Sequence, residues 1–340
     1  MASHPATMKA WMYRNTSGVP GIGLEKNLNL ETTDAPPAPK RNEVVVKVVS
    51  ASINPADYKV PEMGLPARLW IGMPAIPGMD FCGRVVATGP DATHLSIGQL
   101  VHGSHSVPVH FGSLGEYLII SSSLIAPVPE GVDADQAASV SIAGQTAYQS
   151  LLLGDLKEGD KVFINGGSGG CGVYAIQIAK VLGYHVTTTC SARNIELCKE
   201  LGADDVIDYT AEKDMSGMLR ERGIVFDHIL DHVGTPDDLY YQSHHFLRAG
   251  GMFVQVGAYS NMVHTSRVAW PSFLGGGKRK YKIFFFKNTQ EHVAQLGKWL
   301  QNGSLKIPVI PYEFEDAPEA FVKLRSGRAQ GKLVVHVSRL

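Results

Sequence analysis

The feature that most limits what this chain can fold into is a glycine-rich turn set between a β-rich run and an apolar helical run. Residues 162–165 (Val-Phe-Ile-Asn) precede it, residues 175–179 (Ala-Ile-Gln-Ile-Ala) follow it, and a second β-rich run comes one helix later at His185–Thr189. This order is typical of a dinucleotide-binding unit, because residues without side chains let backbone N–H groups approach a pyrophosphate at the start of a helix. The flanking runs disfavour the alternative of a flexible loop. We therefore expect cofactor contacts from Gly166, Ser168, Gly169, Gly170, Cys171, Gly172 and Val173.

The end of the second strand of this unit indicates which dinucleotide binds. An NAD site usually places an acid there for the ribose 2′-hydroxyl, whereas the 2′-phosphate of NADP needs hydrogen-bond donors and positive charge. Here Ser191 and Arg193 follow the strand, and the first acid is Glu196. Ser191 is also well placed to cap a helix that begins near Arg193, and both roles are compatible. The sequence favours NADPH (NADP) over NADH.

The second half of the chain alternates between predicted strands and helices. We expect six strands, at Lys161–Asn165, Tyr184–Thr189, Val206–Asp208, Phe226–Leu230, Met252–Val256 and Ile283–Phe286. Six strands with intervening helices predict one complete doubly wound parallel sheet of an α/β protein.

The first part of the chain, from Lys9 to about Glu130, is rich in short strand-like runs broken by Pro and Gly, which predicts a curled β domain. Strand patterns return after a predicted helix over Glu291–Leu300, at Val309–Phe314 and Leu333–Val337. In the simplest topology this tail rejoins the β domain. We expect one domain of residues 1–130 with 289–340 and another of residues 131–288.

Charge and hydropathy exclude several classes of partner. The 340 residues carry a formal net charge of −1, so the chain has no broad basic field for nucleic acid or an acidic membrane. It shows neither a secretory signal pattern nor an apolar run of membrane-spanning length. We expect a cytoplasmic protein that binds no nucleic acid and no membrane.

The cysteines and histidines offer weak metal signals. Cys82, Cys171, Cys190 and Cys198 form no CxxC pair, which disfavours a disulfide scaffold or a four-sulfur zinc site. His102, His105 and His110 form either a zinc site or a histidine-rich loop, and the pattern favours the loop.

Ligands of doubly wound sheets bind at the carboxyl ends of the strands. Residues 231–234 follow the fourth predicted strand and residues 257–260 the fifth, so we expect Val233, Gly257 and Ala258 near the nicotinamide. His232 is either a general base or a hydrogen-bonding loop residue, and the second interpretation is favoured.

Several further motifs carry a family resemblance over nearly the whole chain. They lie at residues 54–59 (Asn-Pro-Ala-Asp-Tyr-Lys), 76–83 (Ile-Pro-Gly-Met-Asp-Phe-Cys-Gly), 143–148 (Ala-Gly-Gln-Thr-Ala-Tyr), 201–204 (Leu-Gly-Ala-Asp) and 327–332 (Gly-Arg-Ala-Gln-Gly-Lys). With the glycine-rich turn, they resemble the medium-chain dehydrogenase/reductase superfamily, in its zinc-independent quinone oxidoreductase and enone reductase branch. The resemblance implies a β-rich GroES-like catalytic domain and a Rossmann domain with a six-stranded parallel sheet.

The resemblance also implies chemistry without a metal. Asn54 stands where the zinc alcohol dehydrogenases have a cysteine, and Met79 stands where they have a histidine. Asp80 alone cannot provide the three ligands that a catalytic zinc needs. Without that Lewis acid, hydride transfer from NADPH to a quinone or an α,β-unsaturated carbonyl fits better than alcohol oxidation.

By the same resemblance, Tyr58 and Lys59 are candidate donors to substrate oxygen, with Asn54 and Asp57 fixing their loop. A packing role for Tyr58 and a surface role for Lys59 are the alternatives. The resemblance places Tyr209 beside the adenosine and lets Lys332 reach the cofactor, with Arg328 a weaker candidate; Thr146 is a further cofactor residue.

Two other functions stay open at this point: a trans-acting enoyl reductase of a polyketide pathway, and a noncatalytic NADPH-binding protein. The apolar run at residues 281–286 predicts an edge strand that pairs with its counterpart in a homodimer. The alternative is that the helix near Glu291 covers this strand within one subunit.

Overall fold

The computed structural model describes residues 4–14, 23–211, 214–223, 225–235, 238–256, 270–274 and 276–339. The chain divides into two compact units, residues 1–145 with 287–340 and residues 146–286. The sequence placed the first boundary at residue 130, after a local Pro-Val-Pro signal. Residues 131–145 instead group with the first unit, where α3 (Ala134–Ser139) buries three alanines against Val49 and Cys82.

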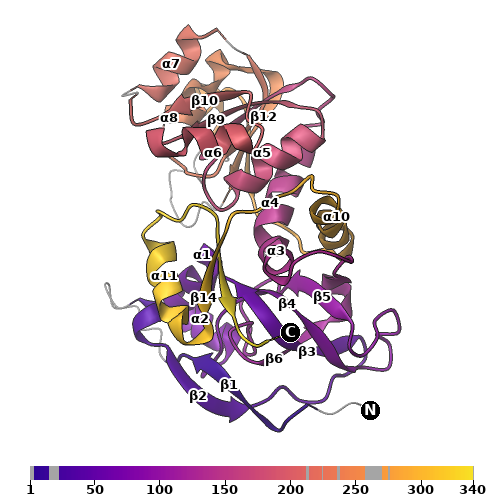
Figure 1. The fold of residues 1–340 in the computed structure, drawn as a ribbon. Helices are drawn as coiled ribbons and strands as arrows, with labels where there is room; N and C mark the ends of the chain where they lie inside the picture. The colour runs from indigo at the N-terminus through magenta and orange to yellow at the C-terminus, as the bar shows by residue number, and fades with distance from the viewer. Residues whose placement is uncertain are drawn as a thin grey trace. The chain divides into compact units, whose positions relative to one another are not determined.

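The first unit is built on a seven-stranded sheet with the order β14-β15-β3-β4-β5-β7, in which β6 also pairs with β3 (Figure 1). A separate antiparallel pair joins β1 (Thr7–Met12) and β2 (Asn29–Asp34). The chain tail rejoins this β-rich unit as the sequence predicts, because β15 pairs with β3 and with β14. The seven strands are β3 (Glu43–Ser52), β4 (Asp80–Thr88), β5 (Leu100–Ser104), β6 (Tyr117–Ser121), β7 (Ile125–Pro127), β14 (Val309–Glu313) and β15 (Lys332–His336).

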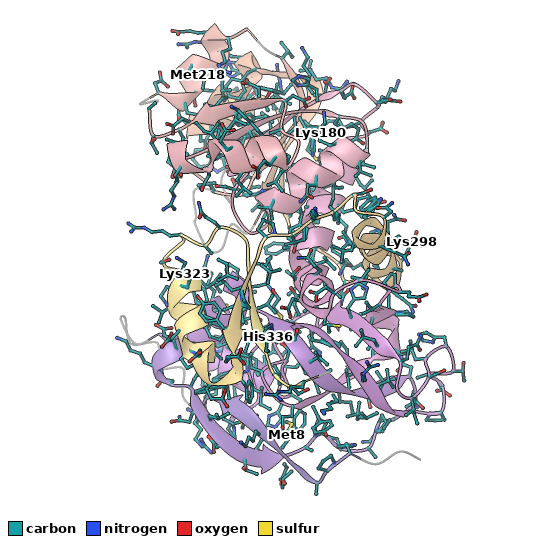
Figure 2. All side chains as sticks on the ribbon, in the orientation of Figure 1. Met8, Lys180, Met218, Lys298, Lys323 and His336 are labelled. Atoms are coloured by element: carbon teal, nitrogen blue, oxygen red, sulfur yellow. The ribbon has the colours of Figure 1, made fainter. Side chains whose placement is uncertain are left out.

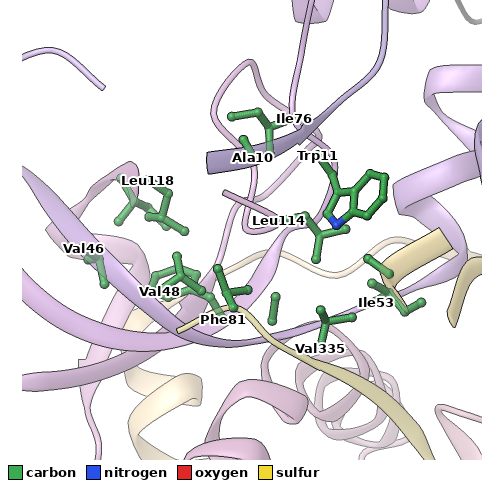
Figure 3. Close-up of a cluster of buried hydrophobic side chains, with 14 of the residues drawn as sticks. Ala10, Trp11, Val46, Val48, Ile53, Ile76, Phe81, Leu114, Leu118 and Val335 are labelled. Atoms are coloured by element: carbon green, nitrogen blue, oxygen red, sulfur yellow. The ribbon is translucent and has the colours of Figure 1, made fainter. Parts of the chain in front are cut away.

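The core of the first unit lies where β1, β3, β4 and β6 bring apolar side chains together (Figure 3). Val46 and Val48 of β3 pack here with Phe81 and Leu118, and each is almost completely buried. Burying a side chain of this size contributes about 1.5 to 3 kcal/mol. Trp11 adds a polar contact, because its indole N–H donates to the carbonyl oxygen of Phe314 at 2.7 Å.

Besides α3, the described part of the first unit contains further helices. They are α1 (Pro55–Lys59), α2 (Leu65–Ile71), α10 (Gln290–Gln301) and α11 (Ala317–Arg325), with 3-10 helices η1 (Leu24–Lys26), η2 (Pro61–Met63), η3 (Ser122–Leu124) and η7 (Phe314–Asp316). The predicted helix at Glu291–Leu300 is confirmed as α10, which begins one residue earlier because the Thr289 hydroxyl accepts from the His292 N–H at 3.3 Å.

The second unit contains the predicted six-stranded parallel sheet, with the order β10-β9-β8-β11-β12-β13. Its strands are β8 (Lys161–Asn165), β9 (His185–Cys190), β10 (Asp205–Asp208), β11 (Phe226–Asp231), β12 (Leu247–Val256) and β13 (Lys280–Phe284). The chain runs outward from β8 to β10 and then returns to β11 on the other side. The strand order therefore reverses between β8 and β11, where ligands of such sheets bind.

The helices described in this unit are α5 (Gly172–Val181), α6 (Ile195–Glu200), α7 (Met215–Glu221) and α8 (Asp238–Gln242), with η4 (Ala192–Asn194), η5 (Ser243–His245) and η6 (Ser272–Leu274). The boundary between the units lies within α4 (Ser141–Leu152). Lys180 of α5, labelled in Figure 2, donates to both carboxylate oxygens of Asp204 at 2.9 and 2.8 Å. Asp204 also accepts from the Val186 N–H at 2.7 Å. The aspartate of the Leu-Gly-Ala-Asp motif therefore links α5 to β9. Throughout the described ranges, no helix is both long and apolar enough to cross a membrane.

Candidate active site

The glycine-rich turn joins β8 to α5 in the second unit. Gly166 has a φ of +91°, in the left-handed region that favours glycine. A Cβ on Gly172 would overlap the carbonyl oxygen of Gly166, so this close approach also requires glycine. Gly169 and Gly170 are exposed. The turn therefore leaves the positive end of a ten-residue helix open to a phosphate, as a dinucleotide requires.

A polar network that the sequence analysis missed holds this turn. The Thr189 hydroxyl accepts from the Gly166 N–H at 2.9 Å and donates to Oδ1 of Asn165 at 2.7 Å. Nδ2 of Asn165 donates to Asp231 at 2.9 Å, and Asp231 also accepts from the Val233 N–H at 3.0 Å. Asn165 and Asp231 are the last residues of β8 and β11, and Thr189 is the last but one of β9, the strand on the other side of β8. Polar side chains at the carboxyl ends of adjacent parallel strands were the signal that could have found them.

The residues expected at the 2′-phosphate lie at the end of β9. Ser191 occupies the N-cap position of η4 but makes no capping hydrogen bond with its side chain. Nδ2 of Asn194 instead donates to the hydroxyls of Ser168 and Ser191, at 2.9 and 3.3 Å. Arg193 is exposed. The structure thus connects Ser191 to the glycine-rich turn through Asn194, which the sequence analysis had not selected.

The other expected cofactor residues occupy different settings. The side chain of Val233 lies against Gly166, where an added Cβ would meet it at 2.6 Å. Tyr209 is 53% exposed, and its N–H donates to the Cys190 carbonyl at 3.1 Å, at the end of β9. Thr146 is buried in α4. Gly257 and Ala258 lie outside the described residues.

His232 follows β11, and its N–H donates to the Asn165 carbonyl at 3.1 Å. Both ring nitrogens are buried, and neither has a hydrogen-bond partner among the described residues. Burial lowers the pKa of His232 to about 4. The imidazole is therefore neutral at pH 7.

The candidate donors of the first unit lie on α1, a helix of five residues. Pro55 supplies the first helical φ, and Asp57 accepts from the Asn54 N–H through Oδ2 at 2.6 Å. Asp57 is buried, Tyr58 is half-buried and Lys59 is exposed. This local geometry separates the carboxyl that holds the helix from the two side chains proposed to meet the substrate.

Lys332 joins Asn54 and Asp80 in a buried polar cluster. Its Nζ donates to Oδ1 of Asn54 at 2.6 Å and lies 4.0 Å from Oδ2 of Asp80. Nδ2 of Asn54 donates to the same Asp80 oxygen at 2.8 Å, and Asp80 Oδ1 accepts from the Ile142 N–H at 3.0 Å. The family resemblance implies a cofactor contact for Lys332. In the structure its ammonium binds the residue that starts α1.

The two carboxyls of this region share one nearby cation. Burial raises the pKa of Asp57 to about 8 and that of Asp80 to about 7, while the Lys332 ammonium opposes both shifts. Oδ1 of Asp57 is buried without a hydrogen-bond partner among the described residues. Two carboxylates beside one ammonium would leave a net buried negative charge, which favours the protonated form of one carboxyl.

The three clustered histidines occupy separate environments. His102 is fully buried, and His105 is 5% exposed. Burial lowers the pKa of each to about 4. His110 packs edge-to-face on Phe111, with ring centroids 4.5 Å apart. The described residues contain no group of three or more His, Cys, Asp or Glu placed to hold a metal ion, and the four cysteines are free thiols.

Comparisons with known proteins agree with this architecture. An alcohol dehydrogenase GroES-like domain matches residues 40–130, and a zinc-binding dehydrogenase domain matches residues 201–335. A trans-enoyl reductase of Aspergillus terreus, pgmF, is 41% identical and covers 98% of this chain and 97% of its own length.

Two further relatives belong to other reductase groups. An NADPH-dependent alkenal/one oxidoreductase of Arabidopsis thaliana, a chloroplastic protein, is 31% identical over 98% of this chain and 81% of its own length. The solved structure of the quinone oxidoreductase from Coxiella burnetii is 32% identical, with a TM-score of 0.83 over 98% of this chain and 100% of that one. The chain is thus an oxidoreductase of the medium-chain dehydrogenase/reductase superfamily, in its quinone oxidoreductase and enone reductase branch.

Proposed function

We propose that this protein is a zinc-independent, NADPH-dependent reductase that transfers hydride to quinones or α,β-unsaturated carbonyls. The main observation behind the proposal is that both polar atoms of the Asn54 amide form hydrogen bonds within the protein. Its oxygen accepts from Lys332 and its nitrogen donates to Asp80, so both polar atoms serve the protein. A primary amide engaged in this way is a poor substitute for a thiolate metal ligand.

The residues of the second unit fit a nicotinamide dinucleotide. The open turn at residues 166–172 would hold the pyrophosphate against the start of α5. Ser191 and the exposed Arg193 would hold the 2′-phosphate, which supports NADPH over NADH. When bound, the cofactor supplies the hydride.

The residues of α1 would act on the acceptor. As the substrate carbon gains hydride, negative charge develops on its conjugated oxygen, and a positioned donor stabilises that charge. Tyr58 offers a hydroxyl donor and Lys59 an ammonium donor from adjacent positions of one short helix. Asn54 and Asp57 hold the start of that helix through the 2.6 Å bond from the Asn54 N–H. The second hydrogen would come from solvent.

Isotope labelling tests this function directly. With NADPH carrying deuterium at the transferable position, we expect the label on the carbon β to the carbonyl of an enone and a solvent-derived hydrogen on the α carbon. The incubation in D₂O with unlabelled NADPH is the matched control and should give the reverse pattern. Label on the carbonyl carbon would show a ketone or aldehyde reductase instead.

A second candidate is a trans-acting enoyl reductase of a polyketide pathway, favoured by the 41% identity to pgmF over almost the full length of both chains. The two functions differ in how the acceptor is presented. NADPH oxidation should be compared with quinones, enones, enals, enoyl thioesters and a carrier-bound enoyl chain. Turnover of the carrier-bound chain without turnover of free acceptors would favour this second function.

A further inference from the structure

Arg325, the last residue of α11, contacts three other elements of the first unit. Its Nη2 donates to Oε1 of Glu62 on η2 at 2.5 Å and to Oε2 of Glu25 on η1 at 2.8 Å. Its Nη1 donates to the second Glu62 oxygen at 3.2 Å. The guanidinium carbon lies 4.2 Å from the ring centroid of Tyr58 on α1. One cation therefore connects α11, η1, η2 and α1, and Figure 1 shows α11 beside α1.

Only an arginine can make this set of contacts. A guanidinium is planar, so it can bond carboxylates at its edge while its face covers an aromatic ring. The two glutamates fix the orientation of that plane, and the plane in turn limits how the Tyr58 ring can rotate. An ammonium on a flexible stem would keep the charge but lose the flat face.

The Tyr58 ring needs such support because α1 has only five residues. A helix this short has little stability of its own, and its geometry depends on tertiary contacts. The bond from the Asn54 N–H to Asp57 holds its start, while Tyr58 and Lys59 lie at its end. The contact from Arg325 acts at that end, on the residue proposed to donate to the substrate.

The same contact affects the acidity of the phenol. Burial raises the pKa of Tyr58, and Arg325 opposes this rise, while Glu62 and Glu25 add to it. Removing the cation would leave the two carboxylates unopposed beside the ring. The phenol would then be both less restrained and a weaker acid.

We propose that Arg325 is a positioning residue that fixes the Tyr58 ring so that its hydroxyl donates to the oxygen of the acceptor. This inference rests on the proposed function, which assigns that donor role to Tyr58. Glu62 takes part indirectly, because its two bonds set the plane of the guanidinium.

The test is a double-mutant cycle on enone reduction with Arg325→Met, Tyr58→Phe and the combined variant. We expect Arg325→Met alone to lower kcat/KM about tenfold, which lies within the range of couplings between residues in contact. In the Y58F background the same substitution should change kcat/KM less than about twofold, because the donor is already absent. Arg325→Lys should restore only part of the activity.

Two readouts separate positioning from a general loss of structure. If the protonated phenol is the donor, removing the cation should move the alkaline limb of the kcat profile to higher pH, and the Kd for NADPH should not change. Arg14→Met is the matched control, because Arg14 also bonds both oxygens of one glutamate, Glu31, at 2.5 and 2.7 Å, without contacting Tyr58. It should leave kcat/KM and the pH profile unchanged.

The outcomes that would overturn the inference are distinct from those that would overturn the function. Equal losses from Arg325→Met in both backgrounds, or no loss in either, would remove the positioning role. If Tyr58→Phe itself has no effect, the inference fails, whereas the labelling pattern still decides whether the protein is an enone reductase. Should Arg325→Met fail to fold, Glu62→Gln takes its place. It must lower kcat/KM by less than the tenfold expected for Arg325→Met, and only in the protein that keeps Tyr58, not in the Y58F background; otherwise the proposal is wrong.

Discussion

Nζ of Lys332 donates to Oδ1 of Asn54 at 2.6 Å, joining the first residue of β15 to the residue that starts α1. The two residues are 278 positions apart in the chain, and the hydrogen bond between them is buried. It brings a cation of the C-terminal segment against the Asp80 carboxyl of β4 and the start of the helix that carries Tyr58 and Lys59. The chain tail thus takes part directly in forming the candidate donor site.

Lys332→Met should destabilise the protein strongly. Asp80 would lose its nearby ammonium while staying buried, and breaking a buried charge pair typically costs about 3 to 5 kcal/mol. Urea unfolding measures the change, with Lys332→Met combined with Asp80→Asn as the control that removes both charges and should recover part of the stability. A single-variant loss below about 0.5 kcal/mol would mean that the ammonium does not compensate the carboxyl.

Because of the raised pKa of Asp57, the free energy of unfolding should fall as the pH rises. Its pKa is about 8 in the folded state, against 3.8 for an ordinary aspartate. Between those values the folded state holds a proton that the unfolded chain has released, so the free energy of unfolding falls by about 1.4 kcal/mol per pH unit. Above the folded pKa both states have released the proton, so Asp57 lowers the free energy of unfolding no further.

Asp57→Asn tests this dependence, because an amide keeps an oxygen for the Asn54 N–H and cannot titrate. We expect a flatter decline of thermal stability between about pH 4 and pH 8 than in the unsubstituted protein. Asp34→Asn, on β2 and away from the cluster, provides a control that should keep the original slope. Parallel slopes for all three proteins would assign the pH dependence to other groups.

Arg193→Ala should weaken NADPH binding by about 1.5 to 3 kcal/mol, the range for a hydrogen bond to a charged group, with little effect on NADH. The reason is that only NADPH carries the 2′-phosphate that the exposed guanidinium would meet. Fluorescence titration with each cofactor measures the difference. Lys199→Ala removes a nearby α6 cation that pairs with Glu196 at 3.0 Å and should leave both affinities unchanged. Equal losses for the two cofactors would remove the assignment.

Thr189→Val should weaken binding of both dinucleotides by about 1 to 3 kcal/mol, because the Gly166 N–H and Asn165 lose the hydroxyl that links them. Calorimetry with NADPH and NADH measures the loss. Thr187→Val is the control, since Thr187 is a buried residue of the same strand outside this network. If both variants bind NADPH equally well, the network does not shape the turn.

The sequence predicts features that depend on local pattern. The strand at residues 161–165 and the glycine-rich turn that follows it, which ends where α5 begins at Gly172, follow from glycine spacing and β-rich runs, and the structure confirms both. The contact of Arg325 with Tyr58 does not follow in this way, because it forms only when α11 packs beside α1. The boundary at residue 130 was misplaced for a related reason: Pro127 and Pro129 are local signals, whereas the burial of α3 is a tertiary one.

The final prediction concerns association. The order of the second unit's sheet ends at β13, which has a sheet neighbour, β12, on one side. An edge strand with apolar residues can pair with its copy about a two-fold axis and continue the sheet. We therefore propose a homodimer formed through β13.

Light scattering at micromolar concentration should give twice the mass of the chain. Ile283→Arg replaces an apolar residue of β13 with a charged one and should shift the mass to that of one chain, because a charged side chain in place of an apolar one disfavours edge-to-edge pairing of strands. Lys282→Arg keeps the existing charge at the neighbouring position and should leave the dimer intact. A single-chain mass for the unsubstituted protein would rule out the dimer at that concentration, whereas a dimer that survives Ile283→Arg would place the interface away from this strand.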